Sequence, residues 1–375
     1  MSELDISIVI PTRARAEILR DTLGALARQH CDPARMEVIV VMDGACADTR
    51  AMVETLRARF PSSLTLLEQP RAGQGAARNR GMTAARADIV LLLDDDILAE
   101  PQLVREHTRH HVAGKDMIVT GNLPVEDVAG AGAHHRATRD WWAGELRARA
   151  LPDHRFTLRD FVTGNVSFPR ARLLALGGFD PMFSGYGRED YEAGYRLLRA
   201  GLPMVHEPRA AGLHRYRKAP LEWLRQTYSQ GRADVLFARK HPEIVQDVMG
   251  LSPFPAVSWI ARSIAAQERR VLALNAEGGP QWQRAAGIVQ AAHYWRGVRS
   301  EAHGRRELSW LIRAQHAALR AAGRDLGARR RFLAALLLVT ARKRASVSER
   351  HAAANTDRAA PAAAGGAAAT TEPRP

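Results

Sequence analysis

The stretch DIVLLLDDDI, residues 88–97, places an apolar run directly before three consecutive aspartates, Asp94, Asp95 and Asp96. An apolar run of this length, bounded by polar residues, is typical of a buried strand. Three adjacent carboxylates repel one another, so they are costly at the end of such a strand unless a cation neutralises them. The alternative is a solvated turn ahead of a helix at Pro101, and the position directly after an apolar strand counts against it.

Short apolar runs of the same kind recur through the first part of the chain. They occupy residues 6–10, 37–42, 64–68 and 116–120. Between them, apolar residues return at helical spacing, as at Ile18, Leu19, Leu23 and Leu26. Strands that alternate with helices predict an α/β fold with a doubly wound, mostly parallel sheet. Ligands of such sheets bind at the carboxyl ends of the strands, so we look for a site there.

The regular pattern changes twice further along the chain. Residues 121–160 contain Gly130, Gly132 and paired histidines and tryptophans, and we expect a long irregular segment that faces the site. Regularity returns at residues 161–168, in a helix over 189–199 and in a strand over 203–207. We therefore predict a first domain over residues 1–218 (halves of about 1–122 and 123–218), a helical appendage over 219–345 and a disordered tail over 346–375.

Composition and charge narrow the classes of protein. The 375 residues carry a formal net charge of +14, which attracts anions such as nucleotides, anionic lipid or nucleic acid. The two cysteines, Cys31 and Cys46, form neither a disulfide framework nor a metal-ligand spacing. The first residues do not resemble a signal peptide, and the apolar run at 332–341 is about half as long as a spanning helix. We expect a cytoplasmic protein.

Candidate binding residues follow the predicted strands. Asp94 and Asp96, at alternate positions, suit a hard divalent ion such as Mg²⁺ or Mn²⁺ that also binds diphosphate oxygens. The small residues around Gly75 let backbone N–H groups approach a phosphate, and Arg78 can add charge-assisted hydrogen bonds. Further donor-side candidates end the first two strands and the fourth, namely Pro11, Thr12, Arg15, Asp43 and Asp95.

A second group of polar residues lies later in the chain. Glu189 and Asp190 begin the predicted helix, where acidic residues commonly serve only the helix dipole. A carboxylate held there in a cleft can instead accept the proton of an acceptor hydroxyl. His214 follows the last predicted strand, and a lone histidine is usually neither a ligand nor a catalyst.

Taken together, these stretches resemble glycosyltransferase family 2, the nucleotide-diphospho-sugar transferases of the GT-A fold. The resemblance covers about residues 5–216 in the order of the family's motifs: IVIPT at 8–12, the segment 43–48, the segment 75–81, the acidic triplet, and the run from 178 to 197. Residues 44–47 depart from the family's Asp-Asp-Gly-Ser-Thr-Asp pattern. Several ordered motifs point to the family more strongly than any one of them.

The resemblance assigns roles to the candidates. It implies that Asp43 contacts the nucleotide base and that Asp190 is the catalytic base, with Glu189 as the alternative. It also implies that His214 helps Asp96 and Asp94 to hold the metal and the diphosphate. The acceptor side would comprise five residues, Gly164, Asn165, Gly178, Phe179 and Asp180. The resulting expectation is a metal-dependent transfer of sugar from a nucleotide diphosphate donor to a saccharide, lipid-linked or small-molecule acceptor, with inversion.

Other interpretations stay open. A non-catalytic nucleotide-sugar-binding protein or a retaining GT-A transferase would carry many of the same motifs. A nucleic-acid-binding protein would explain the charge, but the sequence has no recognised motif for it, and no nucleic-acid partner is expected. A processive polymer synthase typically carries a Gln-x-x-Arg-Trp motif, which we do not find.

The basic appendage permits two interpretations. Arginine-rich clusters at 329–331 and 342–344 flank the apolar run at 332–341, a pattern that predicts peripheral binding to an anionic membrane surface, on its inner face. The same pattern arises from a helix packed on the first domain or from one that forms a homodimer.

Overall fold

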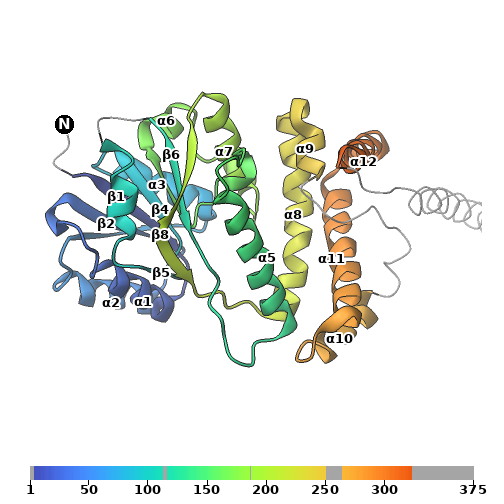
Figure 1. Cartoon of the computed structure of the whole chain (residues 1–375), viewed down its shortest axis with the longest axis horizontal. Coiled ribbons are helices and arrows are strands. Elements are labelled where there is room, and N and C mark those ends of the chain that lie inside the picture. Colours follow the sequence, from blue (N-terminus) through green and yellow to red (C-terminus); the bar gives the residue numbers. More distant parts are fainter. Residues whose placement is uncertain (1–3, 113–115, 186, 251–263, 323–375) are drawn as a thin grey trace, which may run out of the picture.

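The computed structural model describes residues 4–112, 116–185, 187–250 and 264–322, and its N-terminal part is one mixed sheet flanked by helices (Figure 1). The sheet has eight strands in the order β3-β2-β1-β4-β7-β6-β8-β5. Their bounds are β1 Ile6–Thr12, β2 Met36–Asp43, β3 Ser63–Gln69, β4 Ile89–Leu93, β5 Ile97–Ala99, β6 Ile118–Asn122, β7 Asn165–Pro169 and β8 Met204–His214. The predicted mostly parallel α/β sheet is therefore confirmed.

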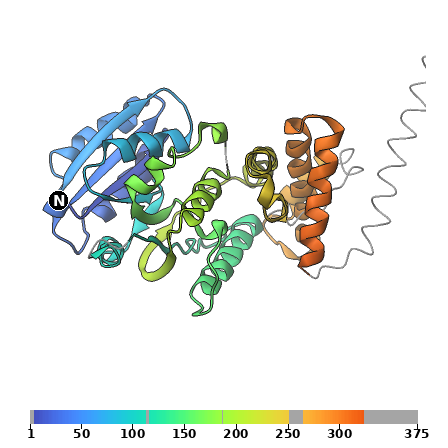
Figure 2. The ribbon, with the colours of Figure 1, turned by 90° about the horizontal axis from the view of Figure 1, so that it is seen from above.

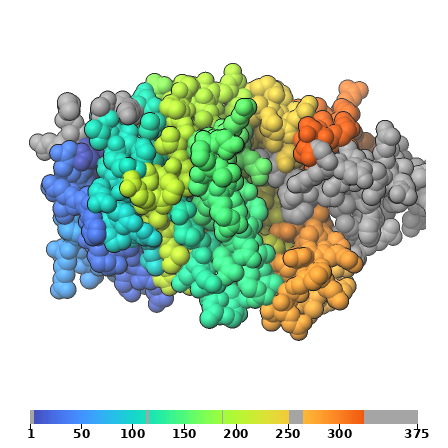
Figure 3. All heavy atoms as spheres, in the orientation of Figure 1, coloured from blue at the N-terminus to red at the C-terminus, as the bar shows by residue number. Residues whose placement is uncertain are grey.

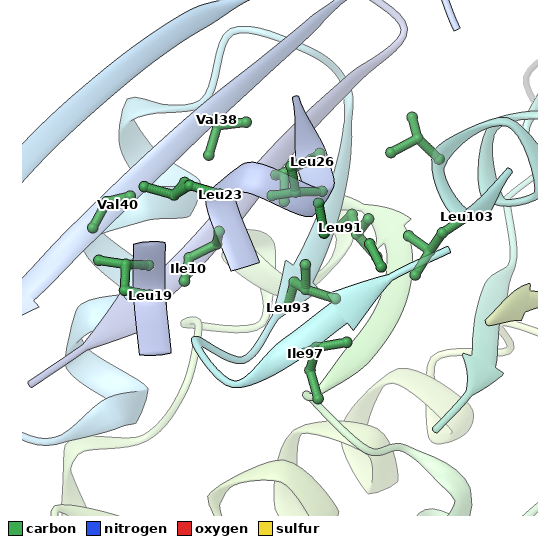
Figure 4. Close-up of a cluster of buried hydrophobic side chains, with 14 of the residues drawn as sticks. Ile10, Leu19, Leu23, Leu26, Val38, Val40, Leu91, Leu93, Ile97 and Leu103 are labelled. Atoms are coloured by element: carbon green, nitrogen blue, oxygen red, sulfur yellow. The ribbon is translucent and has the colours of Figure 1, made fainter. Parts of the chain in front are cut away.

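Side-chain alternation along β1 suits a strand in the interior of the sheet, with a neighbour on each side. Ile8 and Ile10 pack into one hydrophobic cluster and Val9 into another, so both faces of the strand are covered. Figure 4 shows the first cluster, in which Leu19 and Leu23 of helix α1 lie against Ile10 and neighbouring strand residues. The helices of this half are α1 Ala16–Leu26, α2 Ala47–Arg57, α3 Gln74–Ala84 and α4 Leu103–Thr108, with a 3-10 turn at Pro33–Arg35.

The sheet changes direction beside the acidic triplet. Strands β1, β2, β3 and β4 pair in parallel, whereas β7 runs antiparallel to both β4 and β6. Strand β8 is parallel to β6, and the short β5 pairs antiparallel with the end of β8, with Ile97 opposite His214. This pairing brings the residues after the triplet next to a segment more than 100 residues away, a contact that no local pattern predicts.

The expectation of a long irregular segment at 121–160 is wrong in its middle. Helix α5 covers Ala133–Arg149, and Gly132 stands at its N-cap position. The rings of His134 and His135 are buried and bond to the carbonyl oxygens of Lys218 and Glu126 respectively. Tertiary contacts thus stabilise a helix whose sequence, with its glycines and aromatic pair, does not show a clear apolar stripe. Shorter elements of this half are α6 Arg170–Ala175, α7 Glu189–Arg199 and 3-10 turns at Leu158–Asp160 and Pro181–Phe183.

From Pro220 onward the described chain is helical. Its elements are α8 Pro220–Lys240, a 3-10 turn at Pro242–Ile244, α9 Val245–Gly250, α10 Ile264–Ala273, α11 Gly279–Glu301 and α12 Gly304–Ala321. Figures 1 and 2 show α8 nearest to the sheet domain and α11 and α12 beyond it. Figure 3 shows α5 on the front face, between the sheet and these helices. The predicted disordered tail and the basic clusters around 332–341 lie outside the described residues.

The helical region is continuous with the sheet domain in its packing. One hydrophobic cluster joins Phe183 and Leu158 of the first region to Phe237 of α8 and to Tyr294 and Val298 of α11. Among the described residues, no helix is long and apolar enough to cross a membrane.

The contact between α3 and β1 leaves no room for a side chain at Gly81. A Cβ there would collide with Val9, which is fully buried, and would lie 3.2 Å from Val41 Cγ2. We expect Gly81→Ala to lower the free energy of unfolding by about 1–3 kcal/mol, because overpacking displaces the core. Gly24→Ala is the matched control, since its Cβ would meet nothing closer than Arg28 Nη1 at 3.7 Å. The free energy of unfolding of the control, measured by urea denaturation, should rise by roughly 0.5–1 kcal/mol. Equal changes at both sites would contradict this packing.

Candidate active site

Asp95, the middle residue of the triplet, is an internal anchor. Its side chain is buried, Thr12 Oγ1 donates to its Oδ2 at 2.7 Å, and Arg15 Nη1 donates to its Oδ1 at 2.6 Å. Thr22 of α1 donates to its carbonyl oxygen. Burial raises the pKa of Asp95 to about 7, against the effect of Arg15 and Thr12. The expected donor-loop residues Thr12 and Arg15 therefore hold the triplet in place, and Pro11 precedes them at the end of β1.

Asp96 faces the end of β8. Arg15 Nη2 donates to its Oδ2 at 2.9 Å, and its Oδ1 lies 3.5 Å from His214 Nε2. Arg215 donates its backbone N–H to the Asp96 carbonyl. Burial alone would raise the pKa of Asp96, but His214 and Arg15 outweigh it and lower the pKa to about 2. The structure thus brings together two of the three residues, Asp96 and His214, for which the sequence predicts a shared metal, and Asp94 is the third.

Arg78 joins the two halves of the site. Its side chain is 1% exposed, and it donates to Asp94 Oδ1 and to Glu189 Oε1, each at 3.1 Å. Gln74 Oε1 accepts a third bond at 3.3 Å. These partners differ from the leaving diphosphate that the sequence suggests for Arg78, because its charge is already balanced by two carboxylates. Asp94 itself is 33% exposed.

Two glycines allow this close approach. A Cβ at Gly164 would lie 3.1 Å from Asp94 Oδ2, and one at Gly75 would lie 3.2 Å from Phe179 Cβ. Gly75 belongs to the first turn of α3, which carries Arg78. Its observed role is to let α3 approach the segment that leads to Glu189.

Glu189 and Asp190 form the first turn of α7, as the sequence predicts. Glu189 is buried, and its Oε2 has no hydrogen-bond partner within the described part of the chain. Burial, followed by the charge of Glu189, raises the pKa of Asp190 to about 7. A buried acceptor atom and a carboxyl that titrates near neutrality are features of a site that exchanges protons.

Asp43 serves the backbone of the loop before α3. Its carboxylate accepts hydrogen bonds from the N–H groups of Ala72 and Gly73, at 2.7 and 3.0 Å, and from Gln69 Nε2 at 3.0 Å. Gly73 has φ of 95°, and a Cβ there would lie 2.7 Å from the Ser184 carbonyl oxygen. Asp43 therefore orders the loop that leads into α3; its contact with a nucleotide base stays a prediction.

The predicted acceptor-side residues make hydrogen bonds and packing contacts within the protein. The side chain of Asn165 is 1% exposed and bonds to His107 and to the Ala210 carbonyl. Phe179 is fully buried, and its carbonyl accepts a bond from Asn79. Gly178, at φ of 71°, packs against the Asn79 side chain, and Asp180 accepts from the Met182 N–H and binds Lys240.

The sequence patterns did not identify Lys218 as a candidate site residue. Burial lowers the pKa of this lysine, and the charges of Glu222, Asp96 and Asp94 oppose that effect. Its Nζ donates to Gln226 Oε1 of α8 at 2.7 Å. A basic residue four positions after His214 is the only signal in the sequence, and in a chain with 54 lysines and arginines it does not stand out.

Comparisons with known proteins bear on this site. Residues 7–173 match the model of glycosyl transferase family 2, and residues 146–219 match that of the N-terminal domain of galactosyltransferase. Validoxylamine A glucosyltransferase of Streptomyces hygroscopicus subsp. limoneus is 31% identical over 275 residues, covering 65% of this chain and 58% of that protein. Pre-mycofactocin glycosyltransferase of Mycobacterium tuberculosis is 25% identical over 277 residues, covering 73% of this chain and 56% of that protein.

The chain thus spans less than two thirds of the length of these two relatives. Among solved structures, the mannosyltransferase PcManGT from Pyrobaculum calidifontis, in complex with GDP-Man and Mn²⁺, aligns with a TM-score of 0.48 and 18% identity. That alignment covers 90% of this chain and 79% of the other.

Replacing Thr12 tests the anchoring of Asp95. Thr12→Val keeps the volume but removes the hydroxyl that donates to a buried carboxylate oxygen. We expect the free energy of unfolding to fall by about 1–3 kcal/mol, the cost of an unsatisfied buried group, in urea denaturation well above the pKa of Asp95. Thr55→Val on the exposed face of α2 is the control and should change it by less than roughly 0.5 kcal/mol. Equal changes in the free energy of unfolding of the two variants would show that the bond from Thr12 to Asp95 does not stabilise the fold.

Proposed function

The chain belongs to glycosyl transferase family 2 through residues 7–173, and on that premise we propose that it transfers a sugar from a nucleotide diphosphate donor to an acceptor hydroxyl. The observation that carries the proposal is the buried Arg78, which binds Asp94 after β4 and Glu189 at the start of α7. It holds two groups of carboxylates in one site. The acidic triplet suits a divalent cation, and the Glu189–Asp190 pair suits a general base. A donor with a charged leaving group and an acceptor with a proton to lose need this combination.

The residues present fit a divalent cation. Asp96 Oδ1 and His214 Nε2 lie 3.5 Å apart and offer the oxygen and nitrogen donors that Mn²⁺ accepts, while Mg²⁺ commonly takes one or two carboxylates together with phosphate oxygens. Within the described ranges, no group of three or more His, Cys, Asp or Glu side chains could hold a metal ion by itself. We therefore propose that Asp96 and His214 hold the ion together with the donor, with Asp94 beside them.

Charge at the triplet supports the same proposal. Asp94, Asp95, Asp96 and Glu189 outnumber the two guanidiniums that bind them, Arg15 and Arg78. When bound, the cation neutralises the charge that develops on the leaving diphosphate. Burial lowers the pKa of Lys218 against the charges of Glu222, Asp96 and Asp94, and we propose that its ammonium adds positive charge on this side.

The proton of the acceptor hydroxyl goes to a carboxylate of α7. In the proposed reaction the acceptor oxygen attacks the anomeric carbon and transfers its proton to Asp190, while the carbon–oxygen bond to the diphosphate breaks and the nucleotide leaves with the electron pair. Attack from the face opposite the leaving group inverts the anomeric configuration. Glu189 stays the alternative base, because its Oε2 is buried and open to a donor.

The acceptor classes that we consider are a saccharide, a lipid-linked molecule and a small molecule. We propose transfer of single sugars, since the sequence has no Gln-x-x-Arg-Trp motif. A non-catalytic nucleotide-sugar-binding protein would bind the donor without releasing nucleotide diphosphate, and a retaining transferase would give the opposite anomer. Nucleotide release and product NMR distinguish the three.

The role of Asp190 predicts a pH profile. Only the ionised carboxylate accepts a proton, so kcat/KM should rise with pH through about 7, where Asp190 loses its own proton, and should fall below that value. Asp190→Asn should abolish this rise of kcat/KM with pH. It should also lower kcat by about 10²–10⁴-fold with little change in donor affinity. Asp247→Asn, exposed on α9, is the matched control and should leave the profile unchanged. A larger loss of kcat in Glu189→Gln than in Asp190→Asn would identify Glu189 as the base.

The metal assignment predicts cation-dependent donor binding. A thermal-shift screen of nucleotide diphosphate sugars should identify a donor that stabilises the protein more in Mn²⁺ than in EDTA, by roughly 2.7 kcal/mol at a ligand concentration about 100 times its Kd. Asp96→Asn and His214→Ala should lose the Mn²⁺-dependent part of this stabilisation and the transfer activity. The exposed Asp116→Asn serves as control. Full activity of Asp96→Asn in EDTA would contradict the assignment.

A further inference from the structure

Arg188, the residue directly before the Glu189–Asp190 pair, has an unusual backbone conformation. Its φ is 71° and its ψ is −7°, in the left-handed region. Among the described residues, Ala14 is the other non-glycine with positive φ. This conformation costs an L-residue on the order of 1 kcal/mol or more, so surrounding contacts must maintain it. It also opens α7, because the Arg188 carbonyl accepts the first bond of the helix from Glu192.

The contacts that maintain it come from the helical region. Asp234 of α8 is fully buried, and Arg188 donates to its two carboxylate oxygens through Nε at 2.5 Å and Nη2 at 3.2 Å. Tyr294 of α11 donates its hydroxyl to Asp234 Oδ2 at 2.7 Å. The guanidinium also lies over the ring of Tyr191, 5.0 Å from its centroid. Two helices beyond the sheet domain thus clamp the residue that begins α7.

Helices α8 and α11 cross closely, and this crossing places Tyr294 and Asp234 next to each other beside Arg188. A Cβ at Gly231 of α8 would collide with the Tyr294 carbonyl, and one at Gly297 of α11 would collide with the Tyr228 carbonyl. The two backbones therefore touch through glycines on both sides of the crossing. At this separation the Tyr294 hydroxyl reaches Asp234, which lies one helical turn after Gly231.

We infer that Asp234, supported by Tyr294, is a positioning residue for the reaction: it holds Arg188 in its left-handed conformation and so orients the carboxylates of Glu189 and Asp190. This inference rests on the proposed function. A rotation of the backbone at Arg188 would swing the carboxylates of the next two residues and would move that of Glu189 away from Arg78. Misplacement of a reacting group by about 1 Å can cost 10²-fold in rate. The helical region then takes part in positioning the carboxylates of the active site.

The first test separates turnover from binding. Asp234→Asn weakens the pairing with Arg188 but keeps the shape of the side chain, and we expect it to lower kcat by about 10–100-fold with the KM for the donor within about twofold. Tyr294→Phe, the milder change, should lower kcat several-fold. The matched controls bridge the same two helices elsewhere: Arg232→Gln removes the ion pair with Glu301, and Tyr228→Phe removes the bond to Ser300. Both controls should keep kcat.

The second test is a rescue. Glycine adopts positive φ without a Cβ penalty, so Arg188→Gly needs no clamp to reach the observed conformation. In that background Asp234 is a buried charge without its cation, and Asp234→Asn removes the charge. We therefore expect the double variant Arg188→Gly, Asp234→Asn to recover most of the kcat that Asp234→Asn alone loses, measured well above the pKa of Asp190. A bond that merely stabilises the helical region would give no such recovery, because the double variant lacks the same ion pair.

The outcomes distinguish this inference from the proposed function. If Asp190→Asn retains full turnover, the proposed base is wrong and the inference falls with it. If Asp190→Asn loses turnover while folded Asp234→Asn and Tyr294→Phe keep kcat within about twofold, the inference alone is overturned. A fall in kcat that the double variant does not recover also overturns it, since the ion pair would then act through stability.

Discussion

A guanidinium that is 1% exposed requires partners, and the rest of the site is arranged around those of Arg78. An unpaired buried charge is strongly unfavourable, so Asp94 and Glu189 must lie on either side of it. This requirement joins the end of β4 to the start of α7, which are about 95 residues apart along the chain. Gly75 and Gly164 provide the space, since side chains at either position would press on Phe179 or Asp94.

The charges of the site fall into two groups. Both carboxylate oxygens of Asp95 accept hydrogen bonds, from Thr12 and Arg15, so Asp95 has a structural role. Asp94 is partly exposed to solvent, and Asp96 Oδ1 faces His214 on β8. The raised pKa of Asp190 places that carboxyl near neutrality, and the low pKa of Asp96 keeps it ionised. One carboxylate is thus suited to exchange a proton and the other to bind a cation, because their environments differ.

The helical region is closely coupled to this arrangement. Its core includes Phe183 and Leu158 from the sheet domain, and Asp234 binds Arg188 beside the carboxylate pair. Helix α8 also contacts Lys218 through Gln226. The helical region thus contacts residues on two sides of the proposed site, Arg188 and Lys218.

The sequence by itself determined the alternation of strands and helices, the buried strand before the triplet and the acidic first turn of α7, because these patterns depend on neighbouring residues and on the periods of strand and helix. It did not predict β5, helix α5 or the Arg188–Asp234 clamp. Each of these depends on contacts between distant segments, whose energies outweigh local preference. Only the tertiary structure decided that Arg78 pairs with carboxylates and that Arg15 binds both Asp95 and Asp96, because burial and distance set the partners of a charge.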